Sequence, residues 1–239
     1  MTEDRGGLPP GLALSWGVQP VQRRGPKPGL SVEQIVDTGI EFGDRYGFEA
    51  ISLQRIAAHL GVTTNAMYRY VRSKDELIVL VQDKALGRAP DSILAAGGWR
   101  AGSEAWVHAA VDRYAERPWL LDVPIRGAPT TPNQLHWLEV LLRVLAETSL
   151  SQHDALGCAV LLSGYARSYS AMVRELTANV DVPVQAPAVG AFLVPRLREA
   201  GFEMVAALYT NQEYEDEVDD DLDFGLTRIL DGLQKLIEL

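Results

Sequence analysis

Apolar residues between positions 31 and 46 recur every three or four residues, which is the spacing of a helix that buries one face. The apolar positions are Val32, Ile35, Val36, Ile40 and Phe42. Ser31 and Gln34 have the spacing of a capping box, in which each side chain bonds the backbone N–H of the other residue. Because Gly47 is suited to end a helix, the pattern predicts one from Ser31 to about Tyr46.

Two shorter helices are predicted next, with a glycine between them. Ser52 is a suitable N-cap for the first, and its inward positions are Leu53, Ile56, Ala57 and Leu60. Gly61 supplies the backbone freedom that a tight turn needs. Thr63 opens the second helix, which is expected to extend to about Val71. Its outward positions are Thr64, Asn65, Tyr68 and Arg69.

A second capping box, Ser73 with Glu76, starts a longer helix that would connect this part to the rest of the chain. Prolines and glycines separate the later helices, which are expected over roughly 103–117, 132–148, 152–177, 188–209 and 220–238. The sequence shows neither a strand-like alternation longer than a few residues nor an internal repeat. The prediction is an all-α fold with a three-helix N-terminal module and a larger helical body.

Charge divides the chain into two parts. The net charge of the whole sequence is −10, which by itself disfavours a nucleic-acid partner. Residues 1–90, however, hold 11 basic and 10 acidic residues, whereas residues 91–239 hold 11 and 22. The acidic excess therefore lies in the helical body, and the N-terminal module is free of it.

The composition favours a cytoplasmic protein. The chain is 47% hydrophobic but has no apolar stretch long enough to span a membrane, and its first residues lack the order of a secretion signal. The single cysteine, Cys158, has no disulfide partner and is expected to be a small buried residue rather than a reactive thiol.

Residues 1–28 are rich in proline and glycine and are expected to form a flexible basic arm. The cations of this arm that are candidates for DNA contact are Arg23, Arg24 and Lys27. A basic arm of this kind either enters an adjacent minor groove or only screens phosphates, and we favour contact because the cations cluster beside two prolines. The expected domains are this arm, a module over 29–76 and a helical domain over 77–239.

The two short helices around Gly61 predict a helix-turn-helix, in which the second helix is offered to the major groove of DNA. Asn65 can bond adenine at two positions, and the threonines can contact bases through hydroxyl or methyl groups. Tyr68 and Lys74 would contact phosphates and fix the register. A purely structural three-helix unit would not explain why small polar residues gather on one exposed face.

The resemblance to a known family rests on residues 51–78, ISLQRIAAHLGVTTNAMYRYVRSKDELI. They resemble the DNA-binding domain of the tetracycline-repressor (TetR) family of bacterial transcription regulators, and the match spans about residues 30–78. Weaker similarity to the family's C-terminal regulatory domain continues through 106–121, 136–151 and 224–237. By this resemblance the DNA-contacting or supporting residues would be Ser52, Gln54, Arg55, Thr63, Thr64, Asn65, Tyr68, Arg69 and Lys74. Asn65 departs from the family, because many relatives have Gly or Pro there.

The resemblance implies an all-α homodimer with an N-terminal three-helix DNA-binding domain and a larger ligand-binding and dimerisation domain. A small-molecule effector in the larger domain would alter the spacing of two reading heads and so release a palindromic operator. We expect a repressor, since the family mostly works that way, acting in the bacterial cytoplasm and on the nucleoid when bound to DNA.

Aromatic residues in the larger domain are candidates for an effector site, because such walls suit a planar or largely apolar ligand. They are Trp106, Trp119, Trp137, Tyr165 and Tyr169, with core packing as the alternative for each. His108, His136 and Arg167 are possible polar anchors. No cofactor or metal is expected, because the tetracycline–magnesium binding pattern is not found. The acidic run over 213–221 is interpreted as a solvated loop, with a cation site as the alternative.

Apolar stripes on the helices over 152–177 and 220–238 are candidates for a four-helix dimer interface. The candidate residues are Leu162, Leu226, Ile229, Leu230, Leu233 and Ile237. Stripes of this kind also occur in cores, and the family's dimeric habit favours the interface.

Two other classes of function compete with this interpretation. An enzyme is disfavoured, because the sequence has no phosphate-binding glycine loop, no HExxH motif, no nucleophile elbow and no paired cysteines. An architectural DNA-binding protein without an effector would differ in being insensitive to small molecules. We therefore predict a regulator and not an enzyme.

Overall fold

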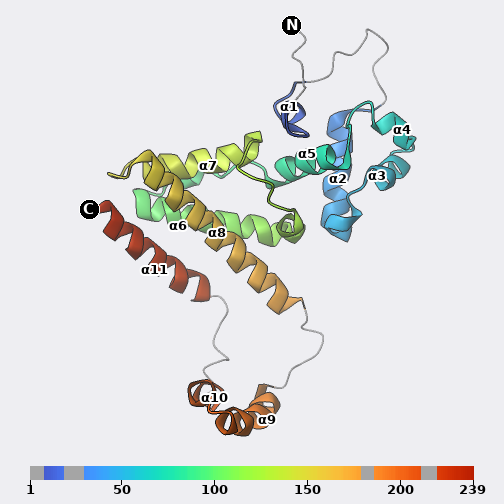
Figure 1. Cartoon of the computed structure of the whole chain (residues 1–239). Coiled ribbons are helices and arrows are strands. Elements are labelled where there is room, and N and C mark those ends of the chain that lie inside the picture. The colour runs from blue at the N-terminus through green and yellow to red at the C-terminus, as the bar shows by residue number, and fades with distance from the viewer. Residues whose placement is uncertain (1–7, 19–29, 179–185, 211–219) are drawn as a thin grey trace. The chain divides into compact units, whose positions relative to one another are not determined.

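The computed structural model describes residues 8–18, 30–178, 186–210 and 220–239, and these residues form helices and connecting turns without a strand (Figure 1). The chain divides into two compact units. The first contains residues 1–170 and 233–239, and the second contains residues 171–232. The all-α prediction is confirmed for the described part of the chain.

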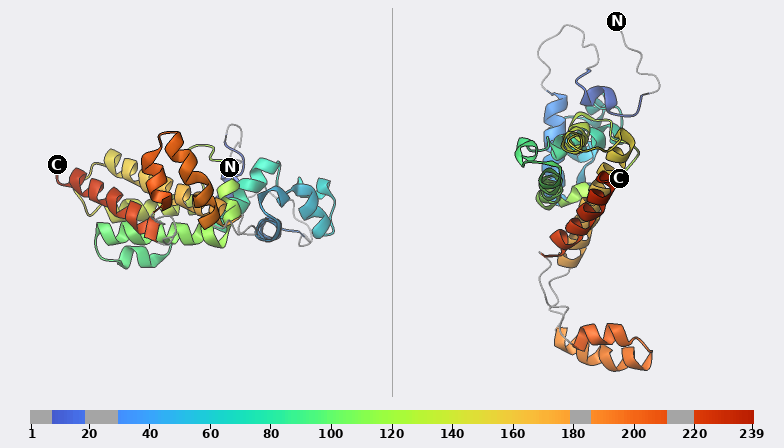
Figure 2. Two further views of the ribbon diagram at one scale, coloured as in Figure 1. Left: turned by 90° about the horizontal axis from the view of Figure 1, so that it is seen from below. Right: turned by 90° about the vertical axis from the view of Figure 1, so that its left-hand side faces the viewer.

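The N-terminal module contains the three predicted helices. Helix α2 spans Val32–Tyr46, and both hydrogen bonds of the Ser31–Gln34 capping box are present. After the short 3₁₀ helix η1 (Phe48–Ala50), α3 (Leu53–His59) and α4 (Thr64–Met67) follow. The views of Figures 1 and 2 place α3 and α4 at one end of the first unit and the later helices α6 and α7 at the other.

The core of this module extends beyond residue 76. Helix α5 (Lys74–Leu86) contributes Leu77, Leu80 and Val81, and the 3₁₀ helix η3 (Pro118–Asp122) contributes Trp119 and Leu120. The expected boundary between residues 76 and 77 is therefore not a packing boundary. Helix α5 also pairs with α2 through Lys84 and Asp37, whose hydrogen bond at 2.5 Å raises the pKa of Lys84.

Three helices of the larger domain complete the first unit. They are α6 (Trp99–Glu116), α7 (Pro132–Leu145) and the first part of α8 (Gln152–Thr177), with the 3₁₀ helix η2 (Asp91–Ala95) before α6. Helix α6 begins four residues before its predicted start, because Gly98 (φ +89°) ends the preceding turn there. Helices α6 and α7 pack closely at Gly102, where a Cβ would lie 2.7 Å from Val144.

The second unit contains a helical hairpin where one helix was expected over 188–209. That prediction was wrong, because the chain forms α9 (Ala186–Glu199) and α10 (Glu203–Thr210) with a turn between them. At the turn Gly201 has φ +78°, and the Phe202 N–H donates to the Leu197 carbonyl at 2.7 Å. A positive φ of this kind stops a helix. Helix α11 (Asp220–Ile237) follows and returns to the first unit at Leu233.

Part of the expected flexible arm is ordered, so the expectation was wrong for residues 8–18. A single helical turn, α1 (Leu12–Ser15), packs against α5, and Leu14 is buried. The cations Arg23, Arg24 and Lys27, and most of the acidic run over 213–221, lie outside the described residues.

Candidate DNA-binding surface and the junction behind it

The turn between α3 and α4 has the geometry of a helix-turn-helix. Ser52 caps α3 by accepting a hydrogen bond from the Arg55 N–H at 3.3 Å. Gly61 has φ +67°, and the next residue, Val62, donates back to the Ala57 carbonyl at 3.0 Å. Thr63 then caps α4 by accepting from the Ala66 N–H at 3.2 Å. Local side chains thus fix where the second helix starts.

Helix α4 is shorter than the predicted helix over 63–71. After Met67 the backbone bonds of Arg69 and Tyr70 span three residues, to Ala66 and Met67, so the chain tightens into a turn. Met67 and Val71 are fully buried and fix this turn to the core. The shortening leaves the outward face of α4 unchanged.

The predicted DNA-contacting residues lie at the surface. Those classed as exposed are Gln54, Arg55, Thr63, Asn65, Tyr68, Arg69 and Lys74. Ser52 and Thr64 are half-buried, and the Ser52 hydroxyl is engaged as the N-cap of α3. Among the described residues, no hydrogen bond engages the side chain of Asn65 or Tyr68. These groups are therefore available to an external partner.

The start of α5 differs from the predicted capping box in one bond. Ser73 accepts from the Glu76 N–H at 3.0 Å, as expected for a cap. The Glu76 carboxylate, however, accepts from the Arg72 N–H rather than from Ser73. The neighbouring Asp75 pairs with Arg126 at 3.0 Å. Lys74, between Ser73 and Asp75 in the sequence, is exposed.

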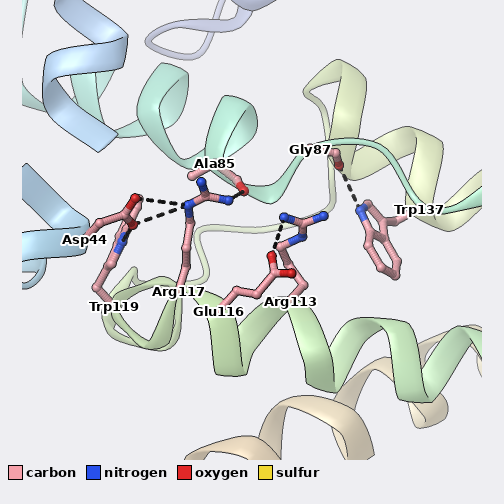
Figure 3. A network of polar contacts seen from close by, with 8 residues as sticks. All are labelled: Asp44, Ala85, Gly87, Arg113, Glu116, Arg117, Trp119 and Trp137. Atoms are coloured by element: carbon pink, nitrogen blue, oxygen red, sulfur yellow. Dashed lines mark hydrogen bonds and ion pairs between the residues drawn. The ribbon is translucent and has the colours of Figure 1, made fainter. Parts of the chain in front are cut away.

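Behind α2 the indole of Trp119 joins the larger domain to the module (Figure 3). Its Nε1–H donates to Asp44 at 2.7 Å, and its ring covers Gly43 so closely that a Cβ there would lie 2.6 Å from it. Arg117 pairs with the same carboxylate at 3.3 Å and donates to the Ala85 carbonyl at 3.2 Å. Helices α2, α5 and η3 are thereby held at one junction.

Asp83 of α5 caps the start of α7, a contact that no local sequence signal predicted. Its carboxylate accepts from the Asn133 N–H at 2.9 Å and from the Gln134 N–H at 3.4 Å. The Asn133 amide also donates to this carboxylate and to the Asp83 carbonyl. Asp83 is buried, and the N–H groups at a helix start compensate such an anion.

The three candidate tryptophans of the effector site have structural contacts instead. Trp106 donates to the Trp137 carbonyl, Trp137 donates to the Gly87 carbonyl, both at 2.9 Å, and their rings meet edge to face (Figure 3 shows the second bond). Together with Trp119 they are at most 5% exposed. Core packing, the alternative to an effector site, therefore accounts for the burial and hydrogen bonds of these three tryptophans. Tyr165 and Tyr169 remain as half-buried candidates, with ring centroids 6.4 Å apart on α8.

Two possible polar anchors are also engaged. His136 accepts the Ala89 N–H at Nδ1, 3.2 Å away, and burial, with a smaller effect from Arg88, lowers the pKa of His136. Arg167 of α8 donates to the backbone carbonyls that end η3, namely those of Leu120, Leu121 and Val123. Arg167 thus ties α8 to the same short helix that carries Trp119.

Most of the proposed dimer-interface residues are buried within the chain. Leu162, Leu226, Leu230 and Leu233 are at most 4% exposed, so they belong to the core and not to an interface, and Ile229 and Ile237 are half-buried. The apolar residues that α8 and α11 leave exposed are Leu156, Val160, Leu161, Met172, Leu176, Phe224 and Leu236. The buried members of the predicted stripes therefore cannot form a dimer interface, and whether α8 and α11 contact a second copy stays a prediction.

Other chemistry is not apparent in the described part of the chain. It contains no group of three or more His, Cys, Asp or Glu residues placed to hold a metal ion. None of its helices is both long and apolar enough to cross a bilayer. Cys158 is buried as expected, and burial raises the pKa of its thiol.

A short exposed helix behind a glycine turn, carried on a larger helical body, defines a helix-turn-helix transcription regulator. A family profile described as "Bacterial regulatory proteins, tetR family" matches residues 35–81, and one described as "Tetracyclin repressor-like, C-terminal domain" matches residues 93–237. The chain belongs to the TetR family.

Curated and solved relatives agree with this assignment. The HTH-type transcriptional repressor DrrR1 of Streptomyces coeruleorubidus is 32% identical over 250 residues, which covers 99% of this chain and 89% of the relative. The structure of ActR from Streptomyces coelicolor in complex with actinorhodin superposes with a TM-score of 0.67 at 21% identity, covering 86% of this chain and 95% of ActR. A TetR variant from Acinetobacter baumannii in complex with minocycline superposes with a TM-score of 0.61 at 14% sequence identity, covering 87% of this chain and 98% of the TetR chain. At these identities the two structures show the shared fold.

Proposed function

We propose that the protein is a ligand-responsive repressor that binds a palindromic operator as a homodimer and is released by a small-molecule effector. It would act in the cytoplasm and lie on the nucleoid while bound to DNA. The observation that carries the proposal is the exposed polar face of α4, where Asn65 and Tyr68 have no hydrogen-bonding role among the described residues. The repressor assignment is supported by DrrR1, a named repressor.

On the operator, α4 would enter the major groove with Thr64 and Asn65 toward the base edges. Asn65 has the amide that recognises adenine through its N6 and N7 positions, and Thr64 can contact a thymine methyl group. Tyr68 and Lys74 would bind phosphates on either side of the groove and set the register. Gln54 and Arg55 are exposed on α3 and would add backbone contacts. Arg23, Arg24 and Lys27 are proposed to add a minor-groove contact.

A palindromic operator requires two reading heads, about 34–36 Å apart or a multiple of that distance. The exposed apolar residues Leu156, Val160 and Leu161 of α8 support a face for a second copy, because isolated monomers seldom expose a cluster of apolar side chains on adjacent turns. Sedimentation at micromolar concentration tests the dimer. A protein that stays monomeric and still binds its operator tightly would contradict it.

The effector is proposed to be a planar, largely apolar molecule that contacts Tyr165 and Tyr169 on α8. The complexes of ActR with actinorhodin and of the TetR variant with minocycline support a small-molecule site in this fold. Arg167 lies between the two tyrosines in sequence and holds the carbonyl end of η3. A ligand that displaces this part of α8 would therefore move η3, and through Trp119 it would move Asp44 and α2.

Selection of bound DNA from a random library, followed by release assays, tests the function. Actinorhodin and minocycline are suitable first probes, in a panel with other planar apolar compounds. We expect one enriched inverted repeat and at least one compound that lowers its occupancy. Failure to enrich any sequence would contradict the DNA-binding role, whereas tight binding that no compound affects would favour an architectural protein.

Two further readouts separate the remaining alternatives. Conversion of a probe by the purified protein would favour an enzyme, so each release assay should include analysis of the recovered compound. A reporter gene downstream of the selected operator distinguishes repression from activation. Replacing Arg23, Arg24 and Lys27 by Gln, which keeps residues 8–18 in place, should lower operator affinity and reduce its salt dependence if the arm contacts DNA.

A further inference from the structure

We propose that residues 8–18, the N-terminal brace, fasten α5 to the loop over 123–131 and thereby hold the DNA-binding helices in one arrangement against the larger domain. All three parts belong to the first compact unit. The effect on DNA binding rests on the proposed function, whereas the fastening itself does not.

On one side the brace is seated directly on α5. A Cβ at Gly11 would lie 2.9 Å from Val79 and 3.2 Å from the Glu76 carbonyl, so the backbone of the brace touches the helix. Gly11 also has φ +78°, which side chains rarely allow. Leu14 is 8% exposed and belongs to the same core cluster as the α5 residue Leu77. These contacts require a glycine and an apolar residue three positions apart.

The brace has a defined end. Gly17 has φ +76°, its N–H donates to the Leu14 carbonyl, and the Val18 N–H donates to the Ala13 carbonyl at 2.9 Å. This is the hydrogen-bond pattern of a Schellman motif. One isolated helical turn is unstable in water, because so few hydrogen bonds do not compensate the ordering of the chain. The turn therefore depends on its contact with α5.

On the other side the brace reaches the larger domain through Trp16. Trp16 is 55% exposed, yet its indole Nε1–H donates to the Thr130 carbonyl at 3.0 Å, 114 positions further along the chain. The hydrogen bond is thus a polar contact made by a half-exposed side chain that lies outside the buried core. It joins the N-terminus to the residues that precede α7.

The loop over 123–131 receives two further restraints. Arg126 pairs with Asp75 at the start of α5, and the Val123 carbonyl accepts from Arg167 of α8. The loop therefore links α5, which follows α4 in the chain, to α8, which carries the candidate effector residues Tyr165 and Tyr169. Loss of the brace removes the third restraint on this loop, the Trp16–Thr130 hydrogen bond, so the arrangement that binds the operator should be less populated.

Two full-length variants test the brace. Gly11→Val introduces a side chain where α5 lies, and Trp16→Phe keeps an aromatic ring but removes the donor to Thr130. Leu8→Ser is the matched control, because Leu8 lies in the same segment and is exposed. Circular dichroism should show unchanged helix content for all three, since only one helical turn is affected.

Hydrogen–deuterium exchange of the amides over 123–131 is the first measurement. We expect exchange to increase by roughly 2- to 10-fold in Trp16→Phe, the range for loss of one hydrogen bond, and by more in Gly11→Val. Leu8→Ser should match the unaltered protein. If both test variants leave the exchange of this loop unchanged, the brace does not fasten it.

Operator affinity on the selected DNA is the second measurement. Several-fold weaker binding by both variants, with no change in the control, is expected. Faster loop exchange without weaker binding would overturn the effect on DNA binding. A protein that selects no DNA would fail the proposed function instead, and the exchange measurement would still decide whether the brace fastens the loop.

Discussion

Two regions of the first unit use similar residues in opposite ways. One is the exposed face of α3 and α4 that is proposed to contact DNA, called here the reading surface, and the other is the junction around α5, η3 and α7. Asn65 stands in the first turn of α4 with an exposed amide, whereas Asn133 stands in the first turn of α7 and donates to Asp83. Tyr68 is 49% exposed, whereas Trp119 is 4% exposed and bonded to Asp44. If the proposed function holds, it is the hydrogen-bond partner of each polar group, and not the residue type, that separates recognition from structure.

This comparison gives a simple expectation for mutagenesis. Substitutions at the junction should change folding stability, and those at the reading surface should change DNA affinity alone.

Replacement of Trp119 by Ala should have the largest effect. The substitution empties the contact over Gly43 and leaves the Asp44 carboxylate without its indole donor, so we expect a loss of about 3–5 kcal/mol in the free energy of unfolding. Tyr68→Ala is the matched aromatic control and should change stability by no more than about 0.5 kcal/mol. Urea denaturation measures both. Equal losses in the two variants would contradict the separation.

Replacement of Asp83 by Ala removes the acceptor of three N–H groups at the start of α7. We expect a loss of about 2–3 kcal/mol, because charge-assisted bonds at a buried helix cap are lost together. Asp37→Ala, which breaks an exposed pair with Lys84, should cost about 1 kcal/mol or less. A similar cost for both aspartates in thermal denaturation would show that the cap of α7 is not special.

Asn65→Ala should weaken operator binding by about 1–3 kcal/mol and relax the preference at one adenine position. Its melting temperature should remain unchanged, because the side chain has no hydrogen bond among the described residues. Fluorescence anisotropy on operators with single base changes measures the effect. Gln152→Ala, an exposed amide at the start of α8, serves as the control. Uniform weakening on all sequences would mean that Asn65 contacts phosphate rather than a base.

Lys74→Gln should weaken binding to all sequences alike. Loss of one phosphate contact should reduce the slope of log affinity against log salt concentration by about 0.9 per reading head. Affinity measured over a series of salt concentrations provides the slope. An unchanged slope would exclude Lys74 from the phosphate contacts, and the lysine would then only flank the cap at Ser73.

The smallest effect is expected at His136, whose lowered pKa reflects burial and whose Nδ1 must stay unprotonated to accept from Ala89. Below about pH 6.5 the unfolded chain binds a proton that the folded chain resists, so this histidine makes the protein less stable as the pH falls and has no such effect above that range. In His136→Asn the side-chain oxygen can accept the same bond without titrating. Thermal melts from about pH 7 to pH 5 should therefore show a weaker pH dependence in the variant. Parallel curves would contradict this assignment.

Much of the module could be predicted from the sequence because its signals are local. Ser31, Ser52, Thr63 and Ser73 each cap a helix within three residues of themselves, and Gly61 marks the turn. The exposed face of α4 followed from the same spacing. Whether that face contacts bases stays a prediction.

The junction could not be predicted, since its contacts join distant positions. Asp83 meets Asn133 across 50 positions, and Trp16 meets Thr130 across 114. The aromatic spacing of Trp106 and Trp137 is equally compatible with a core or a ligand wall, and only the partners of their N–H groups separate the two. Gly201 did carry a local signal for the break between α9 and α10, and the helical pattern around it concealed this signal.

The shared core of α2, α5 and η3 limits how reading heads can be exchanged between family members. A chimera joined at residue 76 would cut between Glu76 and Leu77, two buried residues, and would leave Gly43 without the indole that covers it. The transferable cassette must extend through α5, and its recipient must supply a tryptophan at the position of Trp119 to receive it.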